Sequence, residues 1–85
     1  MRITFESEAF EEYVTWQKTN KKIAVKINAL IRSIQRDGLL SGLGKPEPLK
    51  HIKAYSRRID KTNRLVYVAV EGGILIISCE GHYKD

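Results

Sequence analysis

The sequence contains a single cysteine, two prolines and no long apolar segment. The lone Cys79 cannot form an intrachain disulfide, which fits a reducing compartment, and its setting in Ile-Ile-Ser-Cys is typical of a small buried side chain rather than a nucleophile. No apolar run approaches the roughly 20 residues that span a bilayer, and the N-terminal residues become acidic too early for a signal peptide. We therefore expect a cytoplasmic protein without a membrane segment.

Metal-binding side chains are also scarce. The chain has two histidines and one cysteine, and their positions match no zinc-site spacing. Glu47 is the only acidic residue between Gly38 and Lys53, so carboxylates are not clustered there as a magnesium or calcium site requires. We expect neither a bound metal nor another cofactor.

Charge is distributed unevenly along the chain. Residues 1–17 hold one arginine and four glutamates, whereas residues 18–36 hold six basic residues and no acidic one. The formal net charge is +5 and the pI is about 9.5. A chain this basic can bind a polyanion, but a solvated helix face rich in lysine gives the same pattern, so charge alone does not distinguish the two.

Two helices are predicted in the N-terminal half. We expect Ser7 to cap a helix over 8–18, whose glutamates suit the positive end of the helix dipole, and Thr19-Asn20 to separate it from a second helix. A single apolar stripe indicates the second helix, and Gly38 supplies its stop signal. Helices joined by so few residues should form an antiparallel hairpin. The stripe consists of Ile23, Ile27, Leu30, Ile31 and Ile34.

The remaining pattern predicts strands. A short alternating segment over 2–6 precedes the helices, and a long loop over 38–53 follows them. Three strand-like runs come next, separated by gaps of hairpin length with turn residues: 54–60, 64–70 and 74–79. The order β-α-α-β-β-β predicts one α+β domain over 1–85, an antiparallel β-sheet with two N-terminal helices packed on one face.

Three polar residues late in the chain suggest RNA cleavage. Glu47 lies between two prolines that stiffen the loop, Arg64 begins a predicted strand, and His82 follows the last strand. In cleavage without a metal, a carboxylate and a histidine can take the proton of the 2′-OH and protonate the leaving 5′-oxygen, and a guanidinium matches the charge of the transition state. Tyr55 and Tyr83 could stack on bases of single-stranded RNA.

These residues also have purely structural explanations. Glu47 could be an ordinary loop carboxylate and His82 a surface residue, and His51 is an equal rival as the catalytic histidine. Because Arg57 and Arg58 are adjacent on a strand, they point to opposite faces, so one of them must face the non-helical side or an edge, where charges discourage aggregation. Residue chemistry alone leads to a basic α+β domain with RNA processing as one candidate role.

Several motifs in order make the sequence similar to the YoeB/Txe family of bacterial type II toxins, within the wider RelE/ParE superfamily. They are GKPEPLKH from Gly44, SRRI from Ser56, RLVY from Arg64 and the final His82-Tyr83 pair. The segments YVTWQK and KKIAVKINALI also match the two helices of that family. The resemblance covers essentially the whole chain and implies the family fold, an antiparallel sheet with two helices against it.

The resemblance also implies a function. Members of the family cleave mRNA in the ribosomal A site and leave a cyclic phosphate. The resemblance implies Glu47 as general base, His82 as general acid and Arg64 as the cation that stabilises the transition state. It further implies a cognate antitoxin of the YefM/Phd type that covers the site, operator DNA bound by the toxin–antitoxin complex, and a homodimer. The residues expected to support substrate binding are Lys50, Arg58, Tyr83 and Tyr55.

The chain departs from the family pattern in a few places. Asn63 stands where a histidine is common, and we expect it to be a turn residue with little catalytic consequence. The stretch between His51 and SRRI is shorter than usual, and Tyr55 replaces a common tryptophan. Two alternative functions remain at this point: a ParE-like poison of DNA gyrase on the same fold, and a non-catalytic module that binds nucleic acid or a partner through the basic second helix.

Overall fold

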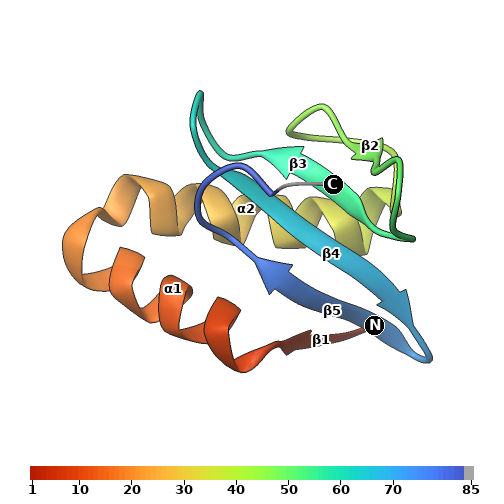
Figure 1. The fold of residues 1–85 in the computed structure, drawn as a ribbon, viewed down its shortest axis with the longest axis horizontal. Helices are drawn as coiled ribbons and strands as arrows, with labels where there is room; N and C mark the ends of the chain where they lie inside the picture. Colours follow the sequence, from red (N-terminus) through yellow and green to blue (C-terminus); the bar gives the residue numbers. More distant parts are fainter. Residues whose placement is uncertain (84–85) are drawn as a thin grey trace.

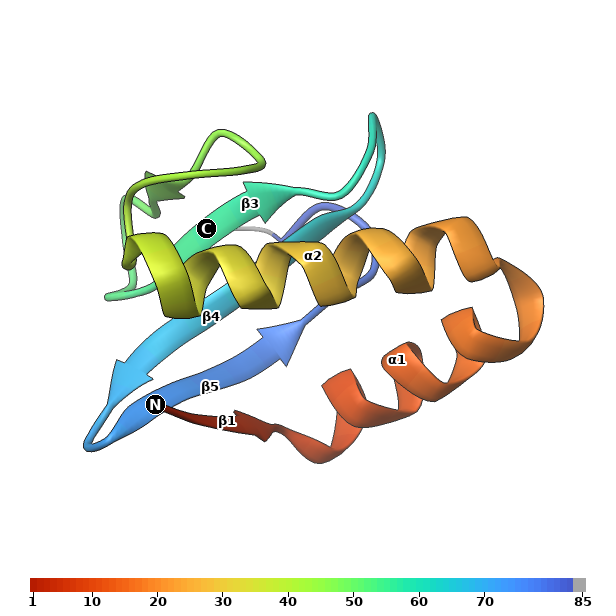
Figure 2. The same ribbon diagram turned by 180° about the vertical axis from the view of Figure 1, so that it is seen from behind.

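Two helices and five strands make up the fold in the computed structural model, which describes residues 1–83 (Figures 1 and 2). In chain order they are β1 (Arg2–Phe5), α1 (Ser7–Thr19), α2 (Lys21–Asp37), β2 (Glu47–Pro48), β3 (Tyr55–Arg58), β4 (Arg64–Val70) and β5 (Gly73–Ser78). The predicted order of elements is confirmed, and the long loop contains one additional short strand, β2. No helix in the described part of the chain is long and apolar enough to cross a membrane.

Both ends of α2 agree with the predicted signals, whereas the start of α1 does not. Asn20 caps α2, because its side-chain oxygen accepts a hydrogen bond from the Ile23 N–H at 3.3 Å. Gly38 ends α2 with a φ of 99°, a conformation that favours glycine. The expected cap at Ser7 is wrong: the N-cap is Glu6, whose side chain makes no capping hydrogen bond, so α1 begins one residue earlier than expected.

The strands form one sheet in the order β1-β5-β4-β3-β2. The pairs from β2 to β5 are antiparallel, as expected, whereas β1 pairs with β5 in parallel, so the sheet is mixed. A parallel pair needs a long crossover, and here both helices and the meander intervene between the two strands. The approach is close at Gly73, where a Cβ would overlap the backbone of Arg2.

The core lies between α2 and one face of the sheet, and α1 packs beside α2 against β5 and β1 (Figures 1 and 2). The α2 side chains of Ile27, Leu30 and Ile34 have no exposed surface, and each such burial stabilises the fold by about 1.5–3 kcal/mol. On the other face, the segment after β5 turns back toward the start of β4 (Figure 1). That second face holds most of the candidate site residues.

Candidate functional site

The strand register brings polar residues from β2, β3 and β4 onto the face of the sheet opposite α2. Glu47 of β2 pairs with Ser56 of β3, which in turn pairs with Val66 of β4, and Arg58 pairs with Arg64. Directly paired residues and alternate residues of a strand share one face. Glu47, Ser56, Arg58 and Arg64 therefore project from the same side of the sheet.

An ion pair joins two of the sequence-predicted residues on this face. The Arg64 Nη1 atom lies 3.2 Å from Glu47 Oε1 and donates a longer hydrogen bond, 3.5 Å, to Ser56 Oγ. Within residues 1–83, Nε and Nη2 of Arg64 have no hydrogen-bond partner, so two of its nitrogens remain available to a ligand. Ser56 is 1% exposed and lies beneath the pair.

A second cation stands directly across the strand pair from the first. Arg58 is exposed and is the register partner of Arg64, and like charges at directly opposite positions destabilise a sheet. A phosphate bound between the two guanidinium groups would relieve this repulsion. Such local electrostatic conflict is expected at functional positions.

His82 reaches this face through the segment that follows β5. The backbone N–H of Arg64 donates to the Gly81 carbonyl at 3.1 Å, so His82 is the residue next to the point where the segment meets β4. Its imidazole is exposed and has no hydrogen-bond partner among the described residues. The structure therefore brings Glu47 and Arg64 into contact, with the backbone of His82 adjacent to that of Arg64.

Asn63 has more than the turn role expected from the sequence. It is 8% exposed, and its side-chain oxygen accepts a hydrogen bond of 2.8 Å from the Gly81 N–H. Together with the Arg64–Gly81 hydrogen bond, this contact fixes the C-terminal segment to the β3–β4 turn. The sequence offered no signal for it, because the two partners are 18 residues apart.

The remaining predicted binding residues are spread over different surfaces. Lys50 and His51 are exposed and, with Tyr55, line a hollow at the β2 edge. Tyr55 stacks on Tyr67, with ring centroids 5.7 Å apart, so its ring lies on the helix side of the sheet rather than on the Glu47 face. Tyr83 lines a separate hollow beside Glu6, Glu8 and Ile77, near the β1 edge.

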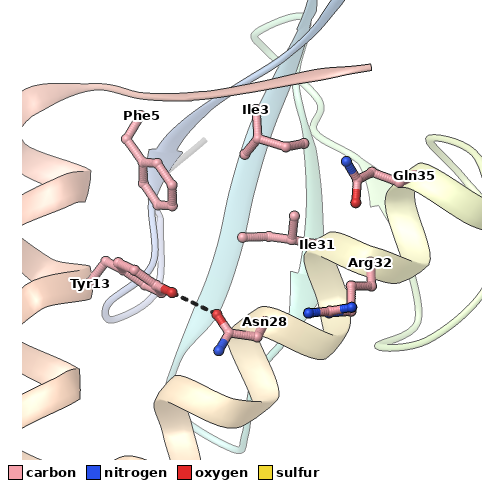
Figure 3. Close-up of a pocket in the computed structure, with 7 residues that line it drawn as sticks. All are labelled: Ile3, Phe5, Tyr13, Asn28, Ile31, Arg32 and Gln35. Atoms are coloured by element: carbon pink, nitrogen blue, oxygen red, sulfur yellow. Dashed lines mark hydrogen bonds between the residues drawn. The ribbon is translucent and has the colours of Figure 1, made fainter.

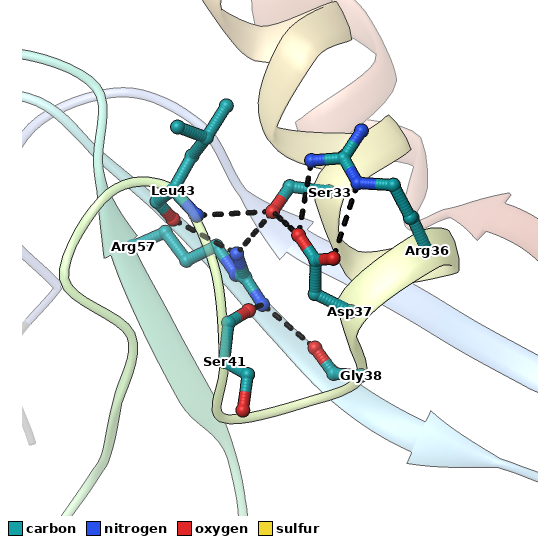
Figure 4. Close-up of polar contacts among 7 residues, drawn as sticks. All are labelled: Ser33, Arg36, Asp37, Gly38, Ser41, Leu43 and Arg57. Carbon is teal, nitrogen blue, oxygen red and sulfur yellow. Dashed lines mark hydrogen bonds and ion pairs between the residues drawn. The ribbon is translucent and has the colours of Figure 1, made fainter.

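Arg57, the neighbour of Arg58, has a structural role that could not be predicted from the sequence. Arg57 is completely buried on the helix side of the sheet, and each of its five N–H groups has an acceptor. Figure 4 shows these acceptors apart from Tyr67. The acceptors are the Tyr67 hydroxyl at 2.9 Å, Ser33 Oγ at 3.0 Å, and the carbonyls of Leu43, Gly38 and Ser41 at 2.8, 2.7 and 2.7 Å. Arg57 thereby fixes the loop that leads from α2 to β2.

Further polar contacts support this buried guanidinium. The Ser33 hydroxyl donates to Asp37 Oδ2 at 2.8 Å while it accepts from Arg57 and from the Leu43 N–H. Hydrogen bonds from Arg36 and Ser33, with the positive charge of Arg57, hold the pKa of Asp37 below its ordinary value. Burial raises the pKa of Tyr67, so its hydroxyl stays protonated and donates to the Leu39 carbonyl at 2.6 Å.

A groove on the helix side of the molecule is separate from the Glu47 face (Figure 3). It has a volume of about 390 Å³ and lies between β1, α1 and α2, where the Tyr13 hydroxyl donates to Asn28 Oδ1 at 2.7 Å. Its lining is Ile3, Phe5, Tyr13, Asn28, Ile31, Arg32 and Gln35. These side chains include no acid–base pair, so the groove is a poorer candidate for chemistry than the polar face.

The chemistry available on the Glu47 face is that of proton transfer beside fixed positive charge. A carboxylate can accept a proton, two guanidinium groups can hold an anion, and an imidazole one residue beyond Gly81 can donate or accept a proton. Among residues 1–83, no three His, Cys, Asp or Glu side chains are grouped closely enough to hold a metal ion.

Comparisons with known proteins point in one direction. Residues 5–83 match the family model of a YoeB-like toxin of bacterial type II toxin–antitoxin systems. Toxin YoeB of Streptomyces coelicolor is 47% identical over 85 residues, covering 98% of this chain and 100% of the relative. A YoeB–YefM complex from Staphylococcus aureus contains a chain that is 49% identical to this one and superposes with a TM-score of 0.90. A YoeB dimer from the same organism contains a chain that is 47% identical and superposes with a TM-score of 0.92. Each match covers 98% of this chain and 98% of the other.

Proposed function

Because the chain belongs to the family of YoeB-like toxins of bacterial type II toxin–antitoxin systems, we propose that it is a ribosome-dependent endoribonuclease that cleaves mRNA in the A site and so stops translation. The proposal is supported above all by one observation: the Glu47–Arg64 ion pair lies on the face of the sheet where the C-terminal segment is fixed beside β4. A carboxylate, a guanidinium and a histidine can supply the base, the cation and the acid for RNA cleavage without a metal.

In the proposed reaction, the Glu47 carboxylate takes the proton of the 2′-OH. The 2′-oxygen attacks the adjacent phosphorus, the bond between phosphorus and the 5′-oxygen breaks, and the His82 imidazolium gives its proton to that oxygen. Arg64, with Arg58 opposite it, binds the phosphate oxygens as negative charge builds up. The products are a 2′,3′-cyclic phosphate and a 5′-OH, with the proton gained by Glu47 equal to the one lost by His82.

The ribosome has a physical part in this proposal. One exposed ion pair holds Glu47, and the exposed imidazole of His82 has no hydrogen-bond partner among the described residues, so we infer that the protein alone does not align the two groups fully. Misplacement of about 1 Å can cost about 100-fold in rate, and ordering of the mRNA in the A site would supply the missing alignment. We infer that free RNA is a poor substrate.

Partners of the chain are proposed from its relatives. Because structures of YoeB with YefM and of a YoeB dimer are known from S. aureus, we infer that this chain also binds a YefM-type antitoxin and forms a homodimer. The antitoxin would cover the Glu47 face, and the complex would bind operator DNA. A basic chain in the cytoplasm, with a net charge of +5, suits binding to the ribosome.

Growth and transcript mapping test the proposal. Induction of the wild-type chain should arrest growth and create new mRNA 5′ ends within codons, whereas Glu47→Gln, Arg64→Ala and His82→Ala should each allow growth. Lys53→Ala, an exposed change in the same loop as Glu47, serves as the matched control and should remain toxic. If all three site variants arrest growth as the wild type does, the assignment of the site is wrong.

The ParE-like alternative uses the same fold without an acid–base pair. It predicts that the purified chain inhibits supercoiling by DNA gyrase and leaves translation in vitro intact. It also predicts that Glu47→Gln retains full inhibition of supercoiling. The proposed ribonuclease predicts that the purified chain leaves supercoiling by DNA gyrase unchanged and stops translation in vitro.

A further inference from the structure

The segment after β5 is fixed to the rest of the molecule at two residues, Cys79 and Gly81. At Cys79, the backbone N–H donates to Glu12 Oε1 at 2.8 Å and the carbonyl accepts from Trp16 Nε1 at 2.9 Å. At Gly81, the N–H donates to Asn63 Oδ1 and the carbonyl accepts from the Arg64 N–H. The first residue beyond these attachments is His82, so the position of its backbone depends on them.

The Gly81 attachment depends on how the Asn63 amide is oriented. The Asn63 Nδ2 atom donates to both oxygens of Asp60, at 3.1 and 3.2 Å. A carboxylate only accepts hydrogen bonds and a backbone N–H only donates, so a flipped amide would lose the contacts on both sides. The amide oxygen must therefore face Gly81.

The Asp60 carboxylate is itself fixed within the turn. Its Oδ1 atom accepts from the backbone N–H groups of Thr62 at 2.9 Å and Asn63 at 2.8 Å. Hydrogen bonds from Thr62 and Asn63 hold the pKa of Asp60 below its ordinary value, so the carboxylate remains an acceptor at neutral pH. Asn63 is 8% exposed, which limits competition from water for these hydrogen bonds.

We propose that Asn63, oriented by Asp60, is a positioning residue that holds the Gly81 backbone and so places His82 over the Glu47–Arg64 face. This inference rests on the proposed function, in which His82 protonates the leaving oxygen. Its consequence is specific: loss of the Asn63–Gly81 hydrogen bond should impair the proton donation by His82 and leave the attack promoted by Glu47 intact.

The test is single-turnover cleavage of mRNA in the A site of purified ribosomes by Asn63→Ala. We expect the rate constant to fall by about 10- to 100-fold, with ribosome affinity changed by less than about twofold. Lys61→Ala is the matched control, because Lys61 is exposed in the same turn and makes no hydrogen bond within residues 1–83, and it should cleave at the wild-type rate. Should Asn63→Ala fail to fold, Asn63→Ser replaces it, because serine suits turns and its shorter side chain does not reach Gly81.

A substrate with sulfur in place of the 5′-bridging oxygen separates positioning from general support of the site. A thiolate leaves without protonation, since a thiol has a pKa of about 8.5. We expect this substrate to restore Asn63→Ala and His82→Ala, but not Glu47→Gln, to within about threefold of the wild type. Equal losses of Asn63→Ala on both substrates, or no loss on either, would overturn the positioning role. Wild-type cleavage of the ordinary substrate by His82→Ala would instead refute the proposed role of His82, and the positioning role with it.

Discussion

Replacement of Arg57 by lysine tests whether the buried guanidinium fixes the loop between α2 and β2. Lysine keeps the charge but has three donors instead of five, so at least two of the five acceptors lose their partner. Each buried polar group left without a partner costs about 1–3 kcal/mol, which gives about 2–6 kcal/mol. The three loop carbonyls are only partly buried, so we expect the lower part of that range, about 2–4 kcal/mol.

A loss of this size is large for so short a chain. At about 0.05–0.15 kcal/mol per residue, the 85 residues have a total unfolding free energy of about 4–13 kcal/mol. Urea denaturation followed by circular dichroism should show the loss directly, and the Tm should fall by at least about 8 °C. The control is Arg58→Lys, the exposed neighbour, which should change stability by less than about 0.5 kcal/mol. A loss below about 1 kcal/mol for Arg57→Lys would refute the role of the five-donor network.

Three further predictions concern single groups. Burial, reinforced by the negative charge of Glu12, raises the pKa of the Cys79 thiol to about 12. At about pH 8 an aromatic disulfide reagent should therefore leave Cys79 of the folded chain unmodified, and it should label Cys79 once urea unfolds the chain. Labelling of Cys79 without denaturant would contradict its burial. The lowered pKa values of Asp37 and Asp60 contribute stability that is present above the ordinary carboxyl pKa of about 3.9 and is lost as the pH falls through the pKa values of the folded state. The double variant Asp37→Asn/Asp60→Asn should therefore show a smaller drop in Tm between about pH 5 and pH 2 than the wild type. Equal drops would show that other groups govern acid unfolding. Arg64→Lys keeps the positive charge but loses the planar guanidinium, which can contact a phosphate through two nitrogens, so cleavage on ribosomes should slow by about 10-fold or more with the fold intact. Cleavage at the wild-type rate would argue against phosphate contact by two guanidinium nitrogens.

Much of the fold could be predicted because its signals are local. The stripe of α2, the stop at Gly38 and the hairpin-length gaps each depend on a few neighbouring residues, and the structure confirms the elements that they predict. The pairing of β1 with β5 is not local, and nothing in the sequence of β1 specifies its partner or its direction. Strand β2 has two residues, too few for any periodic pattern.

The candidate site shows the same limit more sharply. Motif order indicated Glu47 and Arg64, and the structure joins them in an ion pair, while their chemical roles stay predictions. Which of Arg57 and Arg58 is buried could not be predicted, because the main partners of Arg57 are carbonyls, which every residue has. Asn63 resembled a turn residue because its partner Gly81 is remote in sequence.

Single-turnover cleavage of a defined mRNA in the A site of purified ribosomes tests most directly whether this chain is a ribonuclease. The wild-type chain should leave a 2′,3′-cyclic phosphate and a 5′-OH, and a 2′-deoxy substitution at the cleaved nucleotide should prevent cleavage. Glu47→Gln, which keeps the shape of the side chain but cannot accept the proton, should be slower by about 100-fold or more. Cleavage of the 2′-deoxy substrate, or a wild-type rate for Glu47→Gln, would rule out the proposed attack of the 2′-oxygen with Glu47 as its base.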